Sequence, residues 1–317
     1  MQKIGKFGFS EVGVSLFVLA VIALPFFGFA RGGDKIYVNE DASGTQNGSS
    51  SHPYKTIWQG LDKAHDGDEV IVAKGTYKER ITIPKGVKLS GAGKGKTIIK
   101  SSERNDDPVI NMKDGSKVWG VTVKDGEIGI YVREGAKVDI IDSDIRENRH
   151  EGILIEDGER TDKEKVSIVN CEVKENGWSG IYAKKRKIVI IESGIKGNGK
   201  NGIVFESGVR AWIDDNSMSE NKGSGLVMNL DGADVTVASK NTFRKNSREG
   251  IEVNAFGVAG KVTVRHSRLS ENGHYGVARI SKGSSVSSSV WNGLTIQGDN
   301  TFFGNVSGNT SSIVRGF

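Results

Sequence analysis

Four residues in the carboxyl-terminal third of the sequence could carry out acid–base chemistry on a charged substrate. An arginine can hold a carboxylate while a histidine or tyrosine removes a proton from the adjacent carbon. The candidate catalytic residues are Arg248, Glu252, His274 and Tyr275. The alternative interpretation is an exposed, variable turn without catalytic activity. A weaker candidate of the same kind is formed by Arg149, His150 and Glu151.

Basic residues recur at a second position and could bind a polyanion. They stand eleven residues before successive asparagines of a repeat and are Lys137, Lys165, Lys187, Arg210 and Lys261. Val235 occupies the remaining place in this series. If the repeats stack, these side chains form one edge that could follow an acidic polysaccharide. A solubilising edge that resists aggregation is the alternative interpretation.

Several other chemistries are not supported. The five histidines lack the short spacing that is typical of zinc ligands, so we expect no metal site. Cys171 is the single cysteine, and no internal disulfide can form. The formal net charge of +5 is too small to indicate a nucleic-acid-binding protein.

An internal repeat sets the elements that would position these residues. In each copy, asparagine is followed four residues later by glycine and then by an aliphatic residue, with a period in the twenties. The asparagines are Asn148, Asn176, Asn198, Asn221, Asn246 and Asn272. Such a period indicates a solenoid, in which stacked asparagine side chains can hydrogen-bond from coil to coil as a ladder. We expect each glycine to occupy a tight corner with positive φ.

Between the asparagines, apolar and polar residues alternate as they do in a β-strand. Ile153 and Ile155 should therefore face inward, and Leu154 and Glu156 outward. Leucine-rich repeats are excluded because their leucine consensus is missing, whereas isoleucine and valine favour strands. The predicted fold is all-β, a single-stranded right-handed parallel β-helix. Residues 56–64 should form a short amphipathic helix that caps its N-terminal end.

These repeats resemble those of the pectin-lyase-like superfamily of right-handed parallel β-helix proteins. The N-terminal part, with Ile36-Tyr37-Val38 and Gly75-Thr76-Tyr77, is similar to the superfamily's usual cap. The resemblance implies the fold, and it leaves the chemistry open because many functions share this fold. The stacked aspartates of calcium-dependent lyases, most of the polygalacturonase motifs and the Asp-Pro-His signature of mannuronan epimerases are missing. Calcium is implied by family analogy alone, and we expect no other cofactor.

We predict four segments. Residues 1–30 form a signal peptide or a membrane anchor, because Lys3 and Lys6 precede a long uncharged run that ends in small residues. Residues 31–68 form an N-terminal cap, 69–305 the parallel β-helix and 306–317 a C-terminal tail. Either fate of the leader carries the rest of the chain out of the cytoplasm. The expected location is therefore extracellular, periplasmic or at the cell surface.

The favoured hypothesis is an exported protein that binds an acidic polysaccharide or has a structural role at the cell surface. The alternative is a polysaccharide-modifying enzyme, namely a uronan lyase, epimerase or glycoside hydrolase with an atypical site. A third hypothesis, by fold analogy, is a periplasmic protein that helps to load metal centres. We expect a polysaccharide partner, no nucleic acid, and membrane contact through the N-terminal segment alone.

Overall fold

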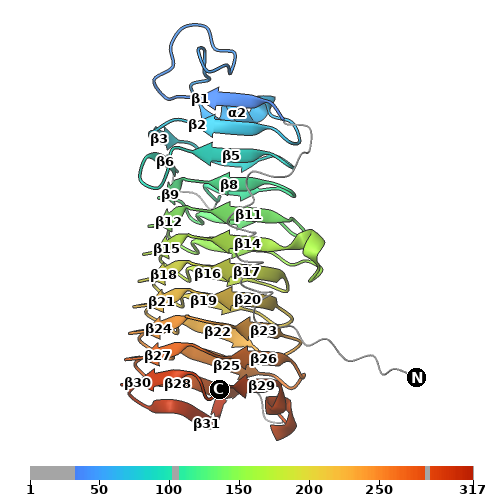
Figure 1. The fold of residues 1–317 in the computed structure, drawn as a ribbon, viewed down its shortest axis with the longest axis vertical. Helices are drawn as coiled ribbons and strands as arrows, with labels where there is room; N and C mark the ends of the chain where they lie inside the picture. The colour runs from blue at the N-terminus through green and yellow to red at the C-terminus, as the bar shows by residue number, and fades with distance from the viewer. Residues whose placement is uncertain (1–32, 102–106, 283–285, 317) are drawn as a thin grey trace, which may run out of the picture. The chain divides into compact units, whose positions relative to one another are not determined.

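The computed structural model describes residues 33–101, 107–282 and 286–316. The chain divides after Gly32, and the second unit, Gly33–Phe317, contains all the described residues. The predicted leader, residues 1–30, lies outside the described residues. Within the second unit, short strands wind into a parallel β-helix whose coils stack one on the next (Figure 1).

The strands of successive coils form three parallel sheets, which we name A, B and C in the order in which each coil crosses them. Sheet A consists of β1 (Lys35–Val38), β2 (Glu69–Val72), β5 (Lys88–Gly91), β8 (Lys117–Trp119), β11 (Val138–Ile141), β14 (Val166–Val169), β17 (Lys187–Ile191), β20 (Arg210–Asp214), β23 (Asp234–Val237), β26 (Lys261–Val264) and β29 (Leu294–Ile296).

Sheets B and C each contain ten strands. Sheet B consists of β3 (Gly75–Lys78), β6 (Thr97–Lys100), β9 (Thr122–Lys124), β12 (Asp144–Arg146), β15 (Glu172–Lys174), β18 (Gly194–Lys196), β21 (Ser217–Ser219), β24 (Thr242–Arg244), β27 (Arg268–Ser270) and β30 (Thr301–Phe303). Sheet C consists of β4 (Ile81–Ile83), β7 (Ile110–Met112), β10 (Ile130–Val132), β13 (Ile153–Ile155), β16 (Ile181–Ala183), β19 (Ile203–Phe205), β22 (Leu226–Asn229), β25 (Ile251–Ala255), β28 (Tyr275–Lys282) and β31 (Gly308–Gly316).

The alternation of apolar residues determines what each strand buries. Ile130, Ile153 and Ile181 lie in register in sheet C and are fully buried. Leu154, between the inward positions of β13, lies half-buried on the outer face. Burying one such aliphatic side chain contributes about 1.5–3 kcal/mol, and the coils repeat this gain along one continuous core. The predicted parallel β-helix is confirmed.

A short helix caps the first coils, as the sequence predicts. Helix α2 spans Ile57–Lys63 and begins at Thr56, whose side chain accepts a hydrogen bond from the backbone of Gln59. The Gln59 side chain in turn accepts from the backbone N–H of Thr56, which completes a capping box. Ile57 and Leu61 are buried against the core. The helix therefore covers apolar side chains that the first coil would otherwise expose.

The six repeat asparagines form one file in the turn between sheets B and C, and all are buried. Each side-chain Nδ2 donates to Oδ1 of the next asparagine at 2.8–3.1 Å, and the file continues from Asn272 to Asn305. Each Nδ2 also donates to a nearby backbone carbonyl, such as that of Ile145 for Asn176. The file thus satisfies buried backbone groups at every turn.

The repeated glycines do not have positive φ, so this expectation is wrong. Positive φ occurs instead at the residue before each asparagine, for example at Glu147 (φ 55°) and Glu271 (φ 57°). The glycines are needed for space. A Cβ on Gly152 would lie 2.7 Å from Asn176 Nδ2 and from the Gly180 carbonyl oxygen. Glycine therefore lets the next asparagine of the file approach the backbone closely.

Turns between sheets C and A vary most in length and include the short 3₁₀ helices η1 (Asp162–Glu164) and η2 (Ser288–Gly293). At the carboxyl end, the predicted tail 306–317 contains β31, which pairs in parallel with β28. Most of this segment therefore belongs to sheet C. No helix in the described ranges has the length and apolar character that crossing a membrane requires.

Candidate functional site

The turns between sheets B and C carry a second file of residues, two positions after each asparagine and, in the turn before Asn148, two positions after Asp125. Backbone hydrogen bonds of 2.7–3.1 Å link consecutive members through Glu127, His150, Trp178, Lys200, Gly223, Arg248, His274 and Ser307. We call this series the turn file. Because the asparagine file fixes each of these turns, it also fixes where the turn-file side chains leave the backbone.

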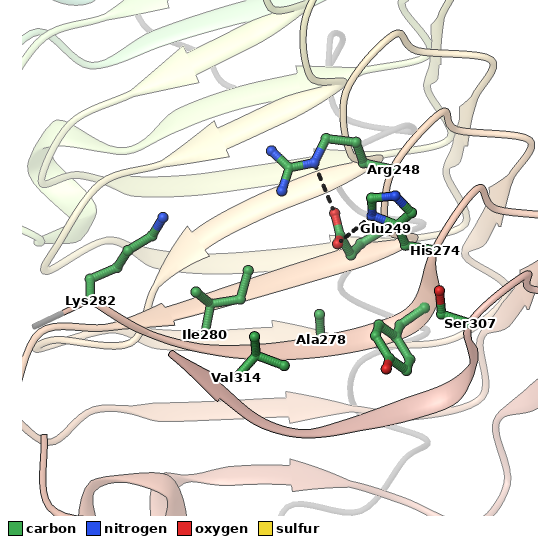
Figure 2. A pocket seen from close by; sticks show the side chains of 9 residues that line it. Arg248, Glu249, His274, Ala278, Ile280, Lys282, Ser307 and Val314 are labelled. Carbon is green, nitrogen blue, oxygen red and sulfur yellow. Dashed lines mark hydrogen bonds and ion pairs between the residues drawn. The ribbon is translucent and has the colours of Figure 1, made fainter. Parts of the chain in front are cut away.

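A cavity of about 410 Å³ opens at the carboxyl-terminal end of the turn file. Its lining comes from two turns, from β28 and from the segment leading into and along β31, as Figure 2 shows. The lining residues are Arg248, Glu249, His274, Tyr275, Ala278, Ile280, Lys282, Ser307 and Val314. The cavity therefore combines an apolar floor with charged groups at its rim.

Glu249 lies at the centre of the charged groups. Its Oε1 is 3.1 Å from Nδ1 of His274, and its Oε2 is 3.4 Å from Nε of Arg248. Nη2 of Arg248 is 3.5 Å from Oε2 of Glu252. Both carboxylates are buried, whereas the side chains of Arg248 and His274 are half exposed. A ligand entering the cavity would meet the arginine and the imidazole first.

Ser224, from the preceding coil, joins the two buried carboxylates. Its Oγ is 3.0 Å from Oε2 of Glu249 and 3.1 Å from Oε2 of Glu252. Because a hydroxyl has a single proton, Ser224 can donate to one carboxylate at a time. Arg248 supplies positive charge to both. The carboxylates are therefore held in place before any ligand arrives.

This geometry gives His274 a defined orientation. Glu249 contacts Nδ1 of the imidazole, which leaves Nε2 for a ligand. A buried carboxylate that orients an imidazole in this way supports its use as a general base. Three of the four candidate catalytic residues, Arg248, His274 and Tyr275, line the cavity. Glu252 contacts this group through Arg248 and Ser224.

The weaker candidate, Arg149 with His150 and Glu151, belongs to a separate group near the other end of the turn file. Glu127 is buried; its Oε1 is 2.7 Å from Nε2 of His150, and its Oε2 accepts a hydrogen bond from Arg149. Glu151 is also buried, and burial raises the pKa of its carboxyl group. The motif of a buried glutamate held by one arginine and one histidine thus occurs twice.

The outer face of sheet C connects the two groups. One outward position, which lies in register from coil to coil, holds Tyr131, Leu154, Tyr182, Val204, Val227, Glu252 and Ala278. The first five are half-buried, so part of each side chain meets solvent. Burial and the Glu206 carboxylate raise the pKa of Tyr182, whose hydroxyl group donates to Glu206. A partly apolar strip therefore leads to the cavity.

The basic series lies at another corner, where sheet A begins. Strand register places Asp234, and not Val235, in line with Arg210 and Lys261. Arg210 Nε is 3.2 Å from Oδ2 of Asp234, and Lys187 Nζ is 2.5 Å from Oδ1 of Asp162. Acidic neighbours thus interrupt the predicted track. The remaining members stand apart from the cavity lining; Lys137 and Lys261 are exposed and Lys165 is half-buried.

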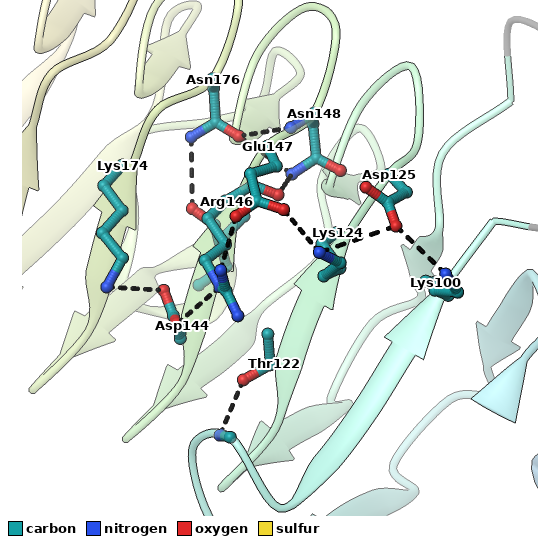
Figure 3. A network of polar contacts seen from close by, with 12 residues as sticks. Lys100, Thr122, Lys124, Asp125, Asp144, Arg146, Glu147, Asn148, Lys174 and Asn176 are labelled. Atoms are coloured by element: carbon teal, nitrogen blue, oxygen red, sulfur yellow. Dashed lines mark hydrogen bonds and ion pairs between the residues drawn. The ribbon is translucent and has the colours of Figure 1, made fainter. Parts of the chain in front are cut away.

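The outer face of sheet B is occupied by ion pairs, as Figure 3 shows. Lys124 Nζ is 2.5 Å from Oε2 of Glu147, and Arg146 Nε is 3.0 Å from Oδ2 of Asp144. Lys174 contacts the same Asp144 from the next coil. These side chains are half-buried, apart from the buried Asp144, and their charges neutralise one another.

Within the described ranges, no three histidine, cysteine or acidic side chains gather in a way that could hold a metal ion. Cys171 is fully buried, and burial raises the pKa of its thiol to about 12. Glu249 and Ser224 also belong to the cavity group, although neither is among the residues predicted from the sequence. Both stand directly before a repeat glycine, which places them in one file but does not predict their contacts with His274 and Glu252.

The three sheets, the asparagine file and the stacked coils define a right-handed parallel β-helix protein. The family model described as a right handed beta helix region matches residues 128–301, more than half of the chain, and the chain belongs to this family. Among curated proteins, none matches this chain.

Solved structures share the fold. The A-module of the mannuronan C-5 epimerase AlgE4 of Azotobacter vinelandii is 16% identical, with a TM-score of 0.52, and the match covers 87% of this chain and 97% of that one. The pectate lyase Pel9A is 15% identical, with a TM-score of 0.51 over 90% and 80% of the chains. An alginate lyase from Paenibacillus sp. str. FPU-7 is 15% identical, with a TM-score of 0.50 over 87% and 99%. At these identities the likeness shows the fold alone.

Proposed function

We propose that this β-helix is exported and binds an acidic polysaccharide along the outer face of sheet C, with one acidic sugar in the cavity. The observation that carries the proposal is the continuity of the partly apolar strip with the cavity rim. Sugar rings have apolar faces that can lie on Tyr182 and Val204, while polar groups at the edges fix orientation. The names of the lyases and the epimerase that share the fold refer to uronans, which supports this class of ligand.

Arg248 and Lys282 are the groups that would recognise the acidic sugar. Both lie at the cavity, and a half-exposed guanidinium can form charge-assisted hydrogen bonds with a carboxylate. Ala278 and Ile280 form an apolar floor below them. A neutral sugar has no carboxylate to accept charge-assisted hydrogen bonds from Arg248 and Lys282, so we expect uronans to bind more tightly than neutral glucans.

Calorimetric titration with uronan oligosaccharides tests this proposal. Arg248→Gln should weaken uronan binding about tenfold or more, because hydrogen bonds to charged groups contribute about 1.5–3 kcal/mol. The matched control is Arg244→Gln on the outer face of sheet B, where Arg244 pairs with Glu271. The control should bind as the unmodified protein does. Absence of uronan binding, or equal losses in the two variants, would overturn the proposal.

A second candidate function is proton abstraction from the bound uronate, and the contact between Glu249 and His274 favours it. Arg248 would neutralise the sugar carboxylate, and His274 Nε2 would accept the C5 proton. Loss of the C4 oxygen substituent then gives an unsaturated sugar, whereas return of a proton to the opposite face gives the epimer. Both outcomes share the first step.

Two readouts separate these reactions from binding alone. Ultraviolet absorbance detects unsaturated ends, and proton exchange at C5 in heavy water detects epimerisation. We expect one of the signals in the unmodified protein and its loss in His274→Gln, with uronan binding retained. If uronans bind and neither signal appears, the enzyme hypothesis fails and the binding proposal stands.

The proposal that the chain is exported rests on the composition of residues 1–30. The full chain and a chain without these residues should separate on cell fractionation, the full chain appearing outside the cytoplasm. Equal distribution of the two chains would contradict export.

A further inference from the structure

We propose that Lys200, held over Trp178, forms a second anion-binding subsite on the turn file, two coils before the cavity's Arg248, and that the two sites bind one acidic polysaccharide together. This inference rests on the proposed function. It assigns a role to the His150 group, which the cavity does not use. The ligand class is a polymer with repeated carboxylate or sulfate groups, because two cationic sites at a fixed separation require repeated negative charge.

Trp178 holds the ammonium group of Lys200 in a defined position. The imidazole of His150 stacks on the indole with ring centroids 3.7 Å apart and an interplanar angle of 16°. Lys200 Nζ lies 3.8 Å from the centroid of the same indole. Because these residues occupy three consecutive coils, the imidazole and the ammonium cover opposite faces of the ring. The indole therefore positions the ammonium, and it is not a free platform for a sugar.

A buried glutamate holds the His150 end of this stack in place. Glu127 is buried and contacts His150 and Arg149. A cation over an indole face gains about 0.5–1 kcal/mol at an exposed site. Lys200 is exposed and forms no ion pair with a carboxylate among the described residues. Burial raises the pKa of the nearby Glu151 carboxyl group, and the charge of Lys200 acts against this shift. An ammonium that is ordered by an aromatic ring and forms no direct ion pair can bind an external anion with little loss of entropy.

Spacing along the turn file links this subsite to the cavity. Backbone hydrogen bonds join Lys200 to Gly223 and Gly223 to Arg248, so two coil steps separate the two cations. At about 4.8 Å for each step, Lys200 and Arg248 lie about 10 Å apart along the solenoid. Gly223 places no side chain between them. An extended polyanion can therefore contact both cations without an obstacle at the intervening turn.

Two linked sites predict a dependence on ligand length. A short oligosaccharide can occupy the cavity alone, whereas a longer one makes its second contact intramolecularly and gains affinity. We expect calorimetry with uronans from disaccharide to decasaccharide to show an increase of at least about tenfold once the ligand reaches Lys200. Raised salt should reduce this increase because it screens the exposed ammonium.

The decisive variants leave the cavity intact. Lys200→Gln and Trp178→Leu should abolish the increase with length while short oligosaccharides bind as before, and Lys200→Arg should retain it. The matched control is Lys196→Gln on sheet B, which removes the same charge from a lysine paired with Glu220. Uronan binding without an increase, or with an increase that Lys200→Gln leaves unchanged, would overturn this inference and spare the proposed function. Absence of uronan binding at any length would overturn both.

Discussion

Asn246 donates a hydrogen bond from its side-chain Nδ2 to Oδ1 of Asn272 at 3.0 Å, and each asparagine stands two residues before a cavity side chain. Those side chains are Arg248 and His274. The same bond that joins two coils therefore also sets the separation of the arginine from the histidine. In this fold, the structural file and the candidate site share one set of turns.

Replacement of Asn246 by alanine should destabilise the protein strongly. Its Oδ1 accepts hydrogen bonds from the backbone and side chain of Asn221, and its Nδ2 donates to the Met218 carbonyl and to Asn272. Each buried group left without a partner costs about 1–3 kcal/mol, so we expect a loss of about 3 kcal/mol or more. Denaturant unfolding followed by circular dichroism measures it.

The matched control for Asn246 is Asn229→Ala. Asn229 lies half-buried on the outer face of β22. We expect its replacement to change the free energy of unfolding by less than about 0.5 kcal/mol, as for most surface substitutions. Similar losses in the two variants would contradict a special role for the asparagine file.

Gly152→Ala tests the revised explanation of the repeat glycines. The new Cβ would lie 2.7 Å from Asn176 Nδ2, the Gly180 carbonyl oxygen and Val173 Cγ1. Overpacking of this kind costs about 1–3 kcal/mol. At Gly298 a Cβ would meet nothing within 4 Å. Gly298→Ala should therefore be neutral or slightly stabilising. Thermal unfolding of the Gly152→Ala and Gly298→Ala variants measures the difference in stability. A tolerated alanine at 152 would refute the space argument.

The fold was predictable because one short motif recurs along the chain and its asparagines repeat the same hydrogen bond from coil to coil. The roles of its residues were less predictable. The glycine position suggested a backbone requirement, whereas the structure shows a steric one at Gly152. Val235 was placed in the basic series by counting back from Asn246. That count crosses a turn with one extra residue, between β23 and β24, so strand register selects Asp234 instead.

The candidate site was predictable in part. Arg248 and His274 share a file, which the repeat spacing indicates. Glu249 could not be assigned from spacing alone, because its contact with His274 depends on how each side chain leaves a stacked turn. The contribution of β31 to the cavity wall could not be predicted from the sequence either, because β31 lies beyond the last repeat motif. Val314 reaches the cavity only through the pairing of β31 with β28.

Arg186 supports the long turn that contains η1. It is fully buried and donates to the backbone carbonyl oxygens of Asp157 at 2.5 Å, Glu156 at 3.1 Å and Glu164 at 3.1 Å. Burial lowers the pKa of its guanidinium, since the charge is removed from water. Arg186→Met would leave these buried oxygens without donors. We expect a loss of about 3 kcal/mol and faster proteolysis within residues 156–165.

The exposed neighbour of Arg186 provides the control for that prediction. Lys185→Met removes the same charge at the adjacent position, where the side chain is exposed. Its proteolysis rate and stability should match those of the unmodified protein. Equal protease resistance in the two variants would show that the turn does not depend on the buried guanidinium.

Cys171 predicts a specific loss of stability in alkali. Burial raises the pKa of its thiol from 9.0 to about 12, so the folded protein keeps this proton in a range where the unfolded chain releases it. Above pH 9 the unfolded state is therefore favoured progressively, and the free energy of unfolding should fall until about pH 12.

Serine occupies the same position in the flanking coils, at Ser143 and Ser193, and both hydroxyl groups donate to backbone carbonyls. Cys171→Ser should fold normally and lose less stability over this pH range. Parallel pH profiles for the two proteins, from denaturant unfolding at each pH, would contradict the assignment of this alkaline effect to the buried thiol.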